Sequence, residues 1–321
     1  MLTEISPESV LGDWKTIIGE SVGIDVDSAW RDLWFITAED GSRYVLKRLG
    51  PWRNLPVADE ARILQHVARR GVAVAEFLPT DRATLYAGPV EESFVLMPML
   101  ASDSFTAAEI VPLEGTIGAA LAELHLALAS YPWPADTAVE RLHASLAEDL
   151  TLPPDVAEAF ARHRDGMIAA LTGLSTQLVH GDLTPENVLL CRPGVVSGFI
   201  DFDHLPMAPR VWDIARYLSR RVRLRWRLAS PEIGPLDALP GFLAGYHQVS
   251  SLRAEEIRAI PAGIAAGNVI EVSYHQRILD GTLPRRRLPD HEAVLADTVE
   301  AARWHLANWD AVETSVRSSV T

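Results

Sequence analysis

The feature that most constrains this sequence is a polar loop enclosed by two short apolar runs. The segment HGDLTPEN (residues 180–187) follows Leu178-Val179 and precedes Val188-Leu189-Leu190. A second apolar run ends in the segment IDFD (residues 200–203). Short apolar runs bounded by turn residues predict strands. Loops held between such strands can direct Asp182, Asn187 and Asp201 to one point.

These three residue types suit the transfer of a phosphoryl group from a nucleotide. One carboxylate can engage a hydroxyl group, while an amide and a second carboxylate supply the oxygen ligands that Mg²⁺ prefers. We therefore interpret Asp182 as the catalytic residue that orients the acceptor hydroxyl and takes its proton. Asn187 and Asp201 are the expected magnesium ligands.

Length and patterning predict an α+β chain with two parts. At 321 residues, the chain exceeds the usual size of one compact core. Before residue 98, strand-like runs lie at 30–37, 44–49, 84–87 and 93–97, with one helical stretch at 57–70. After it, helical patterns prevail at 116–130, 155–172, 211–228, 236–249, 253–278 and 290–312. We expect an N-terminal, nucleotide-binding part at 1–98 and a helical part at 99–321.

Charge and cysteine content exclude several classes of protein. The chain has 29 Lys and Arg against 43 Asp and Glu, a formal charge of −14. This balance argues against binding nucleic acid, which requires clustered basic residues. The single cysteine, Cys191, rules out an intramolecular disulfide framework. We see neither a leader segment nor a membrane span, so a cytoplasmic protein with no membrane partner is expected; the oligomeric state stays open.

The motifs together resemble the aminoglycoside phosphotransferase and choline kinase family, whose members are relatives of protein kinases. The family's loop has the form H-G-D-x-x-x-x-N, and its second motif is I-D-F/W followed by an acid. A D-[LI]-A triplet follows, here Asp213-Ile214-Ala215. The resemblance implies a bilobal protein-kinase-like fold with a small antiparallel β-sheet N-lobe and a larger helical C-lobe. We interpret His180 as a residue that braces the catalytic loop by hydrogen bonds, in preference to one that handles the proton. Asp213 is interpreted as a support residue that accepts hydrogen bonds and holds the loop.

The nucleotide-binding residues are expected in the first part of the chain. Lys47 interrupts an alternating strand and can reach the α- and β-phosphates. Glu60 stands where the family places the glutamate that positions this lysine, whereas Asp59 lies about 100° away around the helix. The segment around Met97 and Met99 resembles the family's interlobe connection. Adenine is expected to pair with its backbone, with Met99 as the better donor because Pro98 has no N–H.

The acceptor is expected to be a small, amine-bearing molecule, because the chain is acidic and the family acts on such compounds. Aminoglycosides, other antibiotics, amino alcohols and amino sugars all fit. Asp203 is open between a second acid near Mg²⁺, a substrate contact and a surface carboxylate. Glu271, an acid in an apolar helix, is a candidate for acceptor binding or a solvent-facing residue. The basic run Arg216–Arg227 is interpreted as a solvated helix face.

The resulting prediction is an ATP- and Mg²⁺-dependent phosphotransferase, with GTP not excluded as the donor. A G-x-G-x-x-G loop is absent before Lys47, which leaves the phosphate-contacting loop residues unassigned. Two alternatives stay open: a protein Ser/Thr kinase on the same fold, and a non-catalytic nucleotide-binding regulator. The biological role, in antibiotic resistance, biosynthesis or metabolism, is also open.

Overall fold

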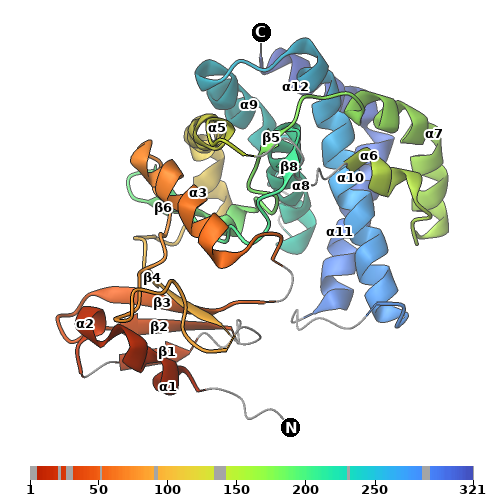
Figure 1. Ribbon diagram of the computed structural model, residues 1–321. Coiled ribbons are helices and arrows are strands. Elements are labelled where there is room, and N and C mark those ends of the chain that lie inside the picture. The colour runs from red at the N-terminus through yellow and green to blue at the C-terminus, as the bar shows by residue number, and fades with distance from the viewer. Residues whose placement is uncertain are drawn as a thin grey trace. The chain divides into compact units, whose positions relative to one another are not determined.

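The structure is a computed structural model that describes residues 6–20, 23–26, 32–50, 53–89, 93–133, 142–229, 232–283 and 290–320 (Figure 1). Its internal contacts divide it into two compact units. The first comprises Met1–Ser102 with Ser197–Leu205, and the second comprises Asp103–Val196 with Pro206–Thr321. The first unit therefore includes the segment that carries Asp201 and Asp203. Each unit is described by itself.

An antiparallel sheet forms the framework of the first unit, in the order β1-β2-β3-β4 (Figure 1). The strands are β1 (Gly23–Val26), β2 (Leu33–Thr37), β3 (Arg43–Arg48) and β4 (Phe94–Pro98). Lys47 on β3 lies opposite Leu33 on β2 and Val95 on β4. The turn between β2 and β3 contains Gly41 with φ +86°, a backbone conformation that glycine adopts without strain. The hairpin predicted from the sequence is confirmed.

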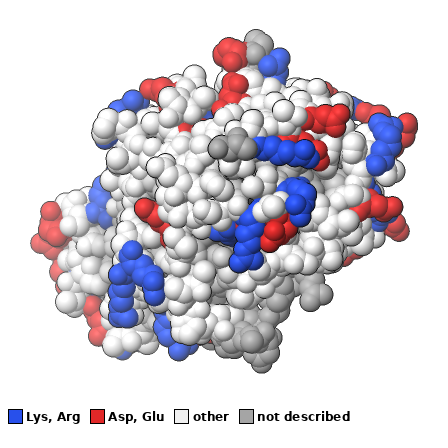
Figure 2. Space-filling model, turned by 90° about the horizontal axis from the view of Figure 1, so that it is seen from above, with Lys and Arg blue, Asp and Glu red and all other residues white. Residues whose placement is uncertain are grey.

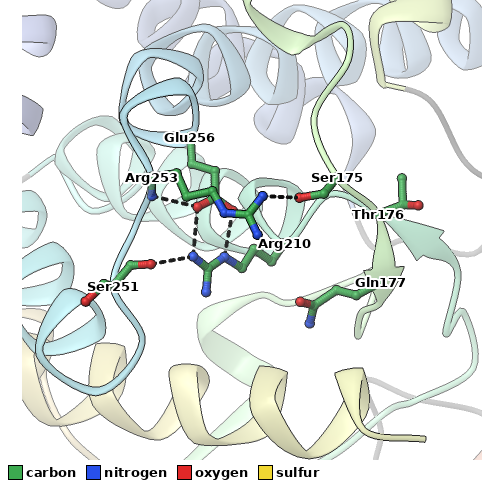
Figure 3. A pocket seen from close by; sticks show the side chains of 7 residues that line it. All are labelled: Ser175, Thr176, Gln177, Arg210, Ser251, Arg253 and Glu256. Carbon is green, nitrogen blue, oxygen red and sulfur yellow. Dashed lines mark hydrogen bonds and ion pairs between the residues drawn. The ribbon is translucent and has the colours of Figure 1, made fainter. Parts of the chain in front are cut away.

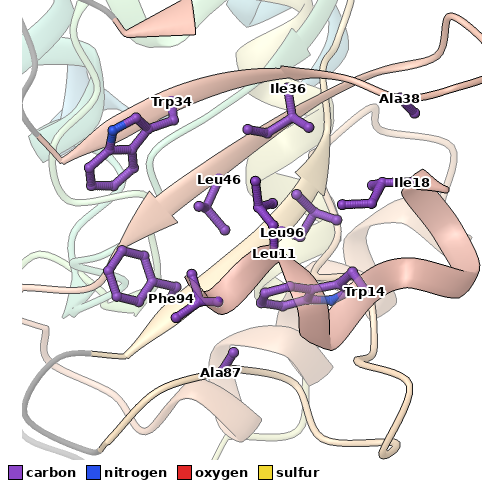
Figure 4. Packing of buried hydrophobic residues seen from close by; sticks show 11 residues of the cluster. Leu11, Trp14, Ile18, Trp34, Ile36, Ala38, Leu46, Ala87, Phe94 and Leu96 are labelled. Atoms are coloured by element: carbon purple, nitrogen blue, oxygen red, sulfur yellow. The ribbon is translucent and has the colours of Figure 1, made fainter. Parts of the chain in front are cut away.

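A compact apolar cluster packs against this sheet (Figure 4). Alternate residues of β2, Trp34 and Ile36, point into it, as the period of two in a strand requires. Helices α1 (Pro7–Leu11) and α2 (Lys15–Ile18) add Leu11 and Ile18, with Trp14 between them. The Trp14 indole is fully buried, and its Nε1 donates to the Leu78 carbonyl at 3.0 Å. The polar end of this large side chain is thereby satisfied.

The strand predicted at 84–87 is not formed. Of this stretch, only Ala87 bridges β4, by exchanging backbone hydrogen bonds of 2.8 and 2.9 Å with Phe94. The Thr84 backbone N–H donates instead to Thr80 Oγ1 at 3.1 Å, within a local turn. A threonine side chain that bonds nearby backbone competes with a sheet ladder, which explains the error.

Helix α3 (Val57–Arg69) and the segment 197–205 complete the first unit. The helix buries Glu60, Ile63, Leu64 and Val67, which lie three or four positions apart and so share one face. The Phe199 N–H donates to the Ala73 carbonyl at 3.0 Å, just beyond this helix.

The second unit is mostly helical, as predicted. Its longer helices are α5 (Glu114–Ala129), α7 (Pro154–Leu171), α8 (Val211–Arg227), α9 (Ala238–Val249), α10 (Ala254–Leu279), α11 (His291–Ala307) and α12 (Trp309–Ser318). The short helices are α4 (Ala107–Ile110) and α6 (Leu142–Ala147). The helix expected at 290–312 is broken at Asn308, whose side chain donates to the Trp304 carbonyl at 2.8 Å.

Helices α5 and α9 cross in close contact because glycines line the crossing. A Cβ at Gly118 would overlap the Phe242 carbonyl, and one at Gly245 would overlap the Gly115 carbonyl. The stretch Ala107–Ala129 is long and apolar enough to cross a membrane by length and composition. Within it, α5 buries Leu121, Leu124 and Leu128, as a core helix does.

Short strands precede and follow the polar loop at 180–187 along the chain. They are β5 (Gln177–Leu178), β6 (Val188–Cys191), β7 (Val195–Phe199) and β8 (Met207–Ala208), with a 3₁₀ turn at Pro185–Asn187. β5 pairs with β8 in antiparallel register. On the face drawn in Figure 2, basic side chains (blue) and acidic side chains (red) are mixed with one another. The negative charge of the chain is therefore not gathered into one broad patch on this face.

Candidate active site

The polar loop of the second unit is held through its backbone by Asp213, in the first turn of α8. Its carboxylate is fully buried and accepts the backbone N–H groups of His180 at 2.7 Å and Gly181 at 2.9 Å. His125 Nε2 on α5 lies 3.0 Å from the same carboxylate, and His125 Nδ1 lies 2.7 Å from the Tyr246 hydroxyl. Three helices, α5, α8 and α9, and the loop thus share one buried hydrogen-bond network.

Electrostatics favour the ionised form of Asp213. Burial alone would raise its pKa, but the hydrogen bond and charge of His125, the charge of His180 and the Gly181 N–H together lower it. A charged carboxylate with several donors fixes the backbone just before Asp182. Support of the loop by Asp213 and His180 stays a prediction. The hydrogen bonds from the His180 and Gly181 backbone to Asp213 are the contacts that such support requires. Sequence reasoning missed His125 and Tyr246 because nothing local indicates that they meet Asp213.

Asn187 closes the loop from its other end. Its Nδ2 donates to the Asp182 carbonyl at 2.9 Å, so the amide nitrogen is committed within the loop. The amide oxygen accepts no hydrogen bond from the described residues. An amide oxygen without a donor among the described residues can act as a ligand of a hard cation such as Mg²⁺, which prefers oxygen ligands and keeps several waters. The donor type of Asn187 therefore fits the metal-ligand prediction.

In the first unit, Lys47 lies between two carboxylates. Its Nζ is 2.5 Å from Asp201 Oδ1 and 2.9 Å from Asp203 Oδ1. Burial alone would lower the pKa of Lys47, but these carboxylates outweigh it and raise the pKa. Asp201 has φ +67°, a left-handed conformation that is rare for aspartate and marks a constrained position. Lysine and two carboxylates are the groups that a nucleotide with a magnesium ion would engage.

The predicted pair between Lys47 and Glu60 is not the one that the structure forms. Glu60 pairs with Arg53, and Arg53 Nη1 also donates to Asp203 at 2.6 Å. Glu60 is buried on α3, and its carboxylate is occupied by Arg53, which lies just before that helix, instead of by Lys47. Arg53 was missed because it lies in an irregular segment without periodicity.

Asp203, left open by the sequence, is now placed as a buried partner of two cations. Burial alone would raise its pKa, but Lys47 and Arg53 lower it. Its side chain is 6% exposed, so the surface-carboxylate interpretation is wrong.

The expected adenine contacts at Met97 and Met99 differ from the structure in one respect. Met97 lies within β4, opposite Val45. The Met99 N–H donates to the Arg43 carbonyl at 3.0 Å, which extends the pairing of β3 and β4 past Pro98. The donor assigned to adenine is thus engaged within the sheet.

The basic run on α8 is not a solvated face, which corrects the sequence interpretation. Arg221 and Arg223 are 4% exposed. Arg221 Nε is 2.5 Å from Glu114 on α5. Glu114 also accepts the Tyr217 hydroxyl at 3.0 Å, and burial raises its pKa to about 7 against the opposing effects of Arg221 and Tyr217. Helical spacing turns part of this run inward, where its arginines pair with buried acids on other helices.

Glu271 on α10, a candidate for acceptor binding, is held by three arginines of α8. Arg216 Nη1 lies 2.9 Å and Arg220 Nη2 lies 2.5 Å from Oε1, and Arg223 pairs with Oε2. Burial alone would raise the pKa of Glu271, but Arg223, Arg220 and Arg216 hold it far below its usual value. The solvent-facing interpretation of Glu271 is wrong.

The same α8 face reaches the predicted catalytic residue. Arg216 donates to Asp182 Oδ1 from Nε at 3.0 Å and from Nη2 at 2.5 Å. Arg216 is thus shared between Asp182 and Glu271. Burial alone would lower the pKa of Arg216, but these two carboxylates raise it.

A separate polar pocket lies at the N-terminal end of α8 (Figure 3). Arg210 donates to Glu256 through Nε at 2.7 Å and Nη2 at 2.8 Å, and Arg253 Nη1 donates to Ser175 at 3.2 Å. Its lining residues are Ser175, Thr176, Gln177, Arg210, Ser251, Arg253 and Glu256, and none of them was a predicted site residue.

The predicted residues therefore form two groups, one in each unit. Lys47, Asp201 and Asp203 meet in the first unit, where Glu60 joins through Arg53. In the second unit, a chain of contacts joins Asn187, Asp182, Arg216 and Glu271, and the loop before Asp182 rests on Asp213.

A comparison with protein-family profiles identifies the family of the chain that carries these two groups. The profile of the phosphotransferase enzyme family (APH) matches residues 26–249. The chain belongs to this family. The match includes both groups of residues except Glu271, and it confirms the resemblance seen in the sequence. No curated protein matches the sequence.

Solved structures of this type share the fold at low sequence identity. An aminoglycoside phosphotransferase from Alicyclobacillus acidocaldarius is 16% identical with a TM-score of 0.67, and the match covers 100% of this chain and 98% of that one. A choline/ethanolamine kinase family protein from Mesorhizobium loti is 14% identical with a TM-score of 0.64, covering 95% and 94%. An amicoumacin kinase in complex with AMP-PNP and Ca²⁺ is 19% identical with a TM-score of 0.61, covering 89% and 88%.

These comparisons confirm the α+β, protein-kinase-like fold class. The family and fold together make the chain a small-molecule phosphotransferase that uses a hydroxyl group as acceptor.

Proposed function

We propose that this phosphotransferase transfers the γ-phosphoryl group of ATP to a hydroxyl group of a small molecule in a Mg²⁺-dependent reaction. The observation that carries the proposal is the braced loop, in which Asp213 fixes the backbone before Asp182 and Asn187 closes the other end. The similar amicoumacin kinase, solved with AMP-PNP and Ca²⁺, supports a nucleotide and a divalent cation.

Each group would have a distinct role in the reaction. Asp182 would orient the acceptor hydroxyl and take its proton late, since phosphoryl transfer depends mostly on positioning and charge stabilisation. Lys47 would leave its two carboxylates to contact the α- and β-phosphates. Asn187 and Asp201 would hold Mg²⁺, which supplies neutralisation of the phosphate charge. Arg216 would keep the Asp182 carboxylate in place.

An amine-bearing acceptor remains part of the proposal. The similar proteins include an aminoglycoside phosphotransferase and a choline/ethanolamine kinase family protein, whose names indicate amine-bearing acceptors. Neither Glu271 nor Asp203 offers a carboxylate that is not already held by arginine or lysine. The amine would therefore need a different acidic or aromatic partner.

The test is ADP formation from ATP and Mg²⁺ over a panel of aminoglycosides, amino alcohols, amino sugars and other hydroxyl compounds. We expect turnover with at least one small-molecule class, dependence on the divalent cation, and loss of turnover in Asp182→Asn. GTP in place of ATP tests the donor. Phosphorylation of peptides alone, or binding of nucleotide without any transfer, would contradict the proposal.

A further inference from the structure

The inward face of α8 carries a cluster of three arginines, Arg216, Arg220 and Arg223, here called the α8 arginine cluster. Their spacing of four and three residues puts them on one side of the helix. All three pair with a single carboxylate, that of Glu271. Asp182 is the other carboxylate in the cluster, through Arg216. Three guanidinium groups therefore face two carboxylates.

Several donors of the cluster are left over. The Nε of Arg220 and both the Nε and Nη2 of Arg223 are buried without a hydrogen-bond partner among the described residues. The Arg223 side chain is only 5% exposed. Leaving a buried donor of a charged group unsatisfied is costly, so native structures usually supply an acceptor. These donors indicate that an acceptor group belongs here.

The charges around the cluster agree with this conclusion. Burial lowers the pKa of Arg220 to about 10, with Arg223 and Arg216 adding to the effect and Glu271 opposing it. Asp297 on α11 interacts electrostatically with Arg223 and Arg227 but forms no ion pair with either. Arg227 itself pairs with Glu186 at the surface. The described acids therefore do not satisfy the three arginines fully.

Both the cluster and the predicted catalytic residue are partly exposed to solvent. Arg220 is 25% exposed and Asp182 is 27% exposed, whereas Glu271 is 7% exposed. Arg216 contacts both Asp182 and Glu271, so one guanidinium group separates the catalytic carboxylate from the rest of the cluster. An anion bound at Arg220 would thus lie close to a hydroxyl group engaged by Asp182.

We propose that the α8 arginine cluster, through Arg220 above all, is a subsite for a carboxylate group on the acceptor. The proposal rests on the proposed function and narrows its substrate class to hydroxyl compounds that also carry an acid group. A planar carboxylate matches the fork of donors on a guanidinium group. The amine predicted from the sequence is compatible with it, since one acceptor can carry both groups.

The direct test is binding of sodium acetate to the full-length chain at constant ionic strength, measured by isothermal titration. We compare the wild type with Arg220→Gln, Arg220→Lys and the control Arg225→Gln. Arg225 lies on the same helix but contacts the Ile233 carbonyl instead of Glu271. Arg220→Gln leaves Glu271 with two arginines, so the fold should persist.

Saturable binding is expected in the wild type and in Arg225→Gln, with affinity about tenfold to a hundredfold weaker in Arg220→Gln. Arg220→Lys keeps the charge but loses the fork and should lie between them. The proposal is overturned if the wild type shows no saturable binding, or if Arg220→Gln and Arg225→Gln bind acetate equally. It is also overturned if Arg220→Gln weakens ATP binding tenfold, because the cluster would then serve the nucleotide.

A second test uses acceptors that differ only in the acid group. Serine is compared with ethanolamine, and threonine with 1-amino-2-propanol, by ADP formation. Where a pair is phosphorylated, the carboxylate member should have the higher kcat/KM, and Arg220→Gln should remove that preference through KM. A preference for the decarboxylated member would contradict the subsite. The acetate measurement does not depend on turnover. A failure of the proposed function would appear as an absence of Mg·ATP binding, whereas a failure of the subsite would appear as an absence of acetate binding, so the two can be told apart.

Discussion

Arg216 binds the carboxylate of Asp182 through two nitrogens, with Nε at 3.0 Å and Nη2 at 2.5 Å from Oδ1. The same guanidinium reaches Glu271 with Nη1 at 2.9 Å. The predicted catalytic group is therefore held from its own unit, by a residue only three positions beyond Asp213. Sequence reasoning assigned Asp182 but did not indicate this partner.

The substitution Asp182→Asn should remove catalysis and spare nucleotide binding. The amide cannot take the acceptor proton, and positioned acid–base groups usually contribute about 10²–10⁴-fold to the rate. ADP formation under saturating ATP measures the loss, and titration of Mg·ATP measures binding. Asp165→Asn on the exposed side of α7 is the matched control. Retention of more than about a tenth of the wild-type kcat would disprove the role of Asp182.

The substitution Asp201→Ala should abolish the stabilisation that Mg·ATP gives. A ligand at a hundredfold excess over its Kd stabilises the folded state by about 2.7 kcal/mol, and thermal unfolding detects this shift. Without nucleotide the variant should remain folded, since Lys47 keeps its pair with Asp203. Asp280→Ala, at the exposed end of α10, is the control. An undiminished shift in Asp201→Ala would show that Asp201 is not a metal ligand.

The substitution Asp213→Asn should destabilise the fold by about 1–3 kcal/mol, because buried donors on His180, Gly181 and His125 lose a charged acceptor. Urea unfolding at pH 7 measures the change. The pKa of Asp213 is lowered in the folded state, so its contribution is present above about pH 4 and is lost only as the pH falls further. The cost of the substitution should therefore be equal at pH 7 and pH 5. Asp237→Asn, at an exposed turn, should cost much less.

The buried pair of His275 and His291 predicts a loss of stability in mild acid. Their Nδ1 atoms are 3.0 Å apart, and burial, with a smaller effect of His291, lowers the pKa of His275 to about 4. The unfolded histidine has a pKa near 6.5, so unfolding takes up a proton between these values. The free energy of unfolding should fall by up to about 3 kcal/mol from pH 6.5 to pH 4.

His275→Gln should flatten this acid dependence, whereas His66→Gln on the surface of α3 should not. Urea unfolding across the same pH range measures both variants. An unchanged slope in His275→Gln would assign the acid loss to other groups.

Local pattern was enough to predict much of the fold. The β2–β3 hairpin, α3 and the principal helices of the second unit follow from period-two and helical spacing, which act within a few residues. The strand at 84–87 failed because a Thr80–Thr84 turn competes with the ladder. The break at Asn308 was also missed, since both flanking segments are helical.

Sequence reasoning named candidate residues for the site but did not predict how they pair. Asp182, Asn187, Lys47 and Asp201 follow from motif spacing along the chain. The pairs Glu60 with Arg53 and Glu271 with the α8 arginines join residues far apart in sequence, and spacing carries no information on them. Net charge misled the interpretation of α8 in particular, because it does not show which side of a helix is buried.

The order of the functional residues along α8 would fix the distance between the two groups of the acceptor that this helix contacts. Asp213 anchors the loop, Arg216 holds Asp182, and Arg220 follows one turn later, about 6 Å further along the axis. A hydroxyl at Asp182 and an anion at Arg220 would therefore have to be separated by only a few bonds. The reach of the acceptor would be set by the pitch of a helix rather than by a loop, so lengthening the molecule between these two groups should be tolerated poorly.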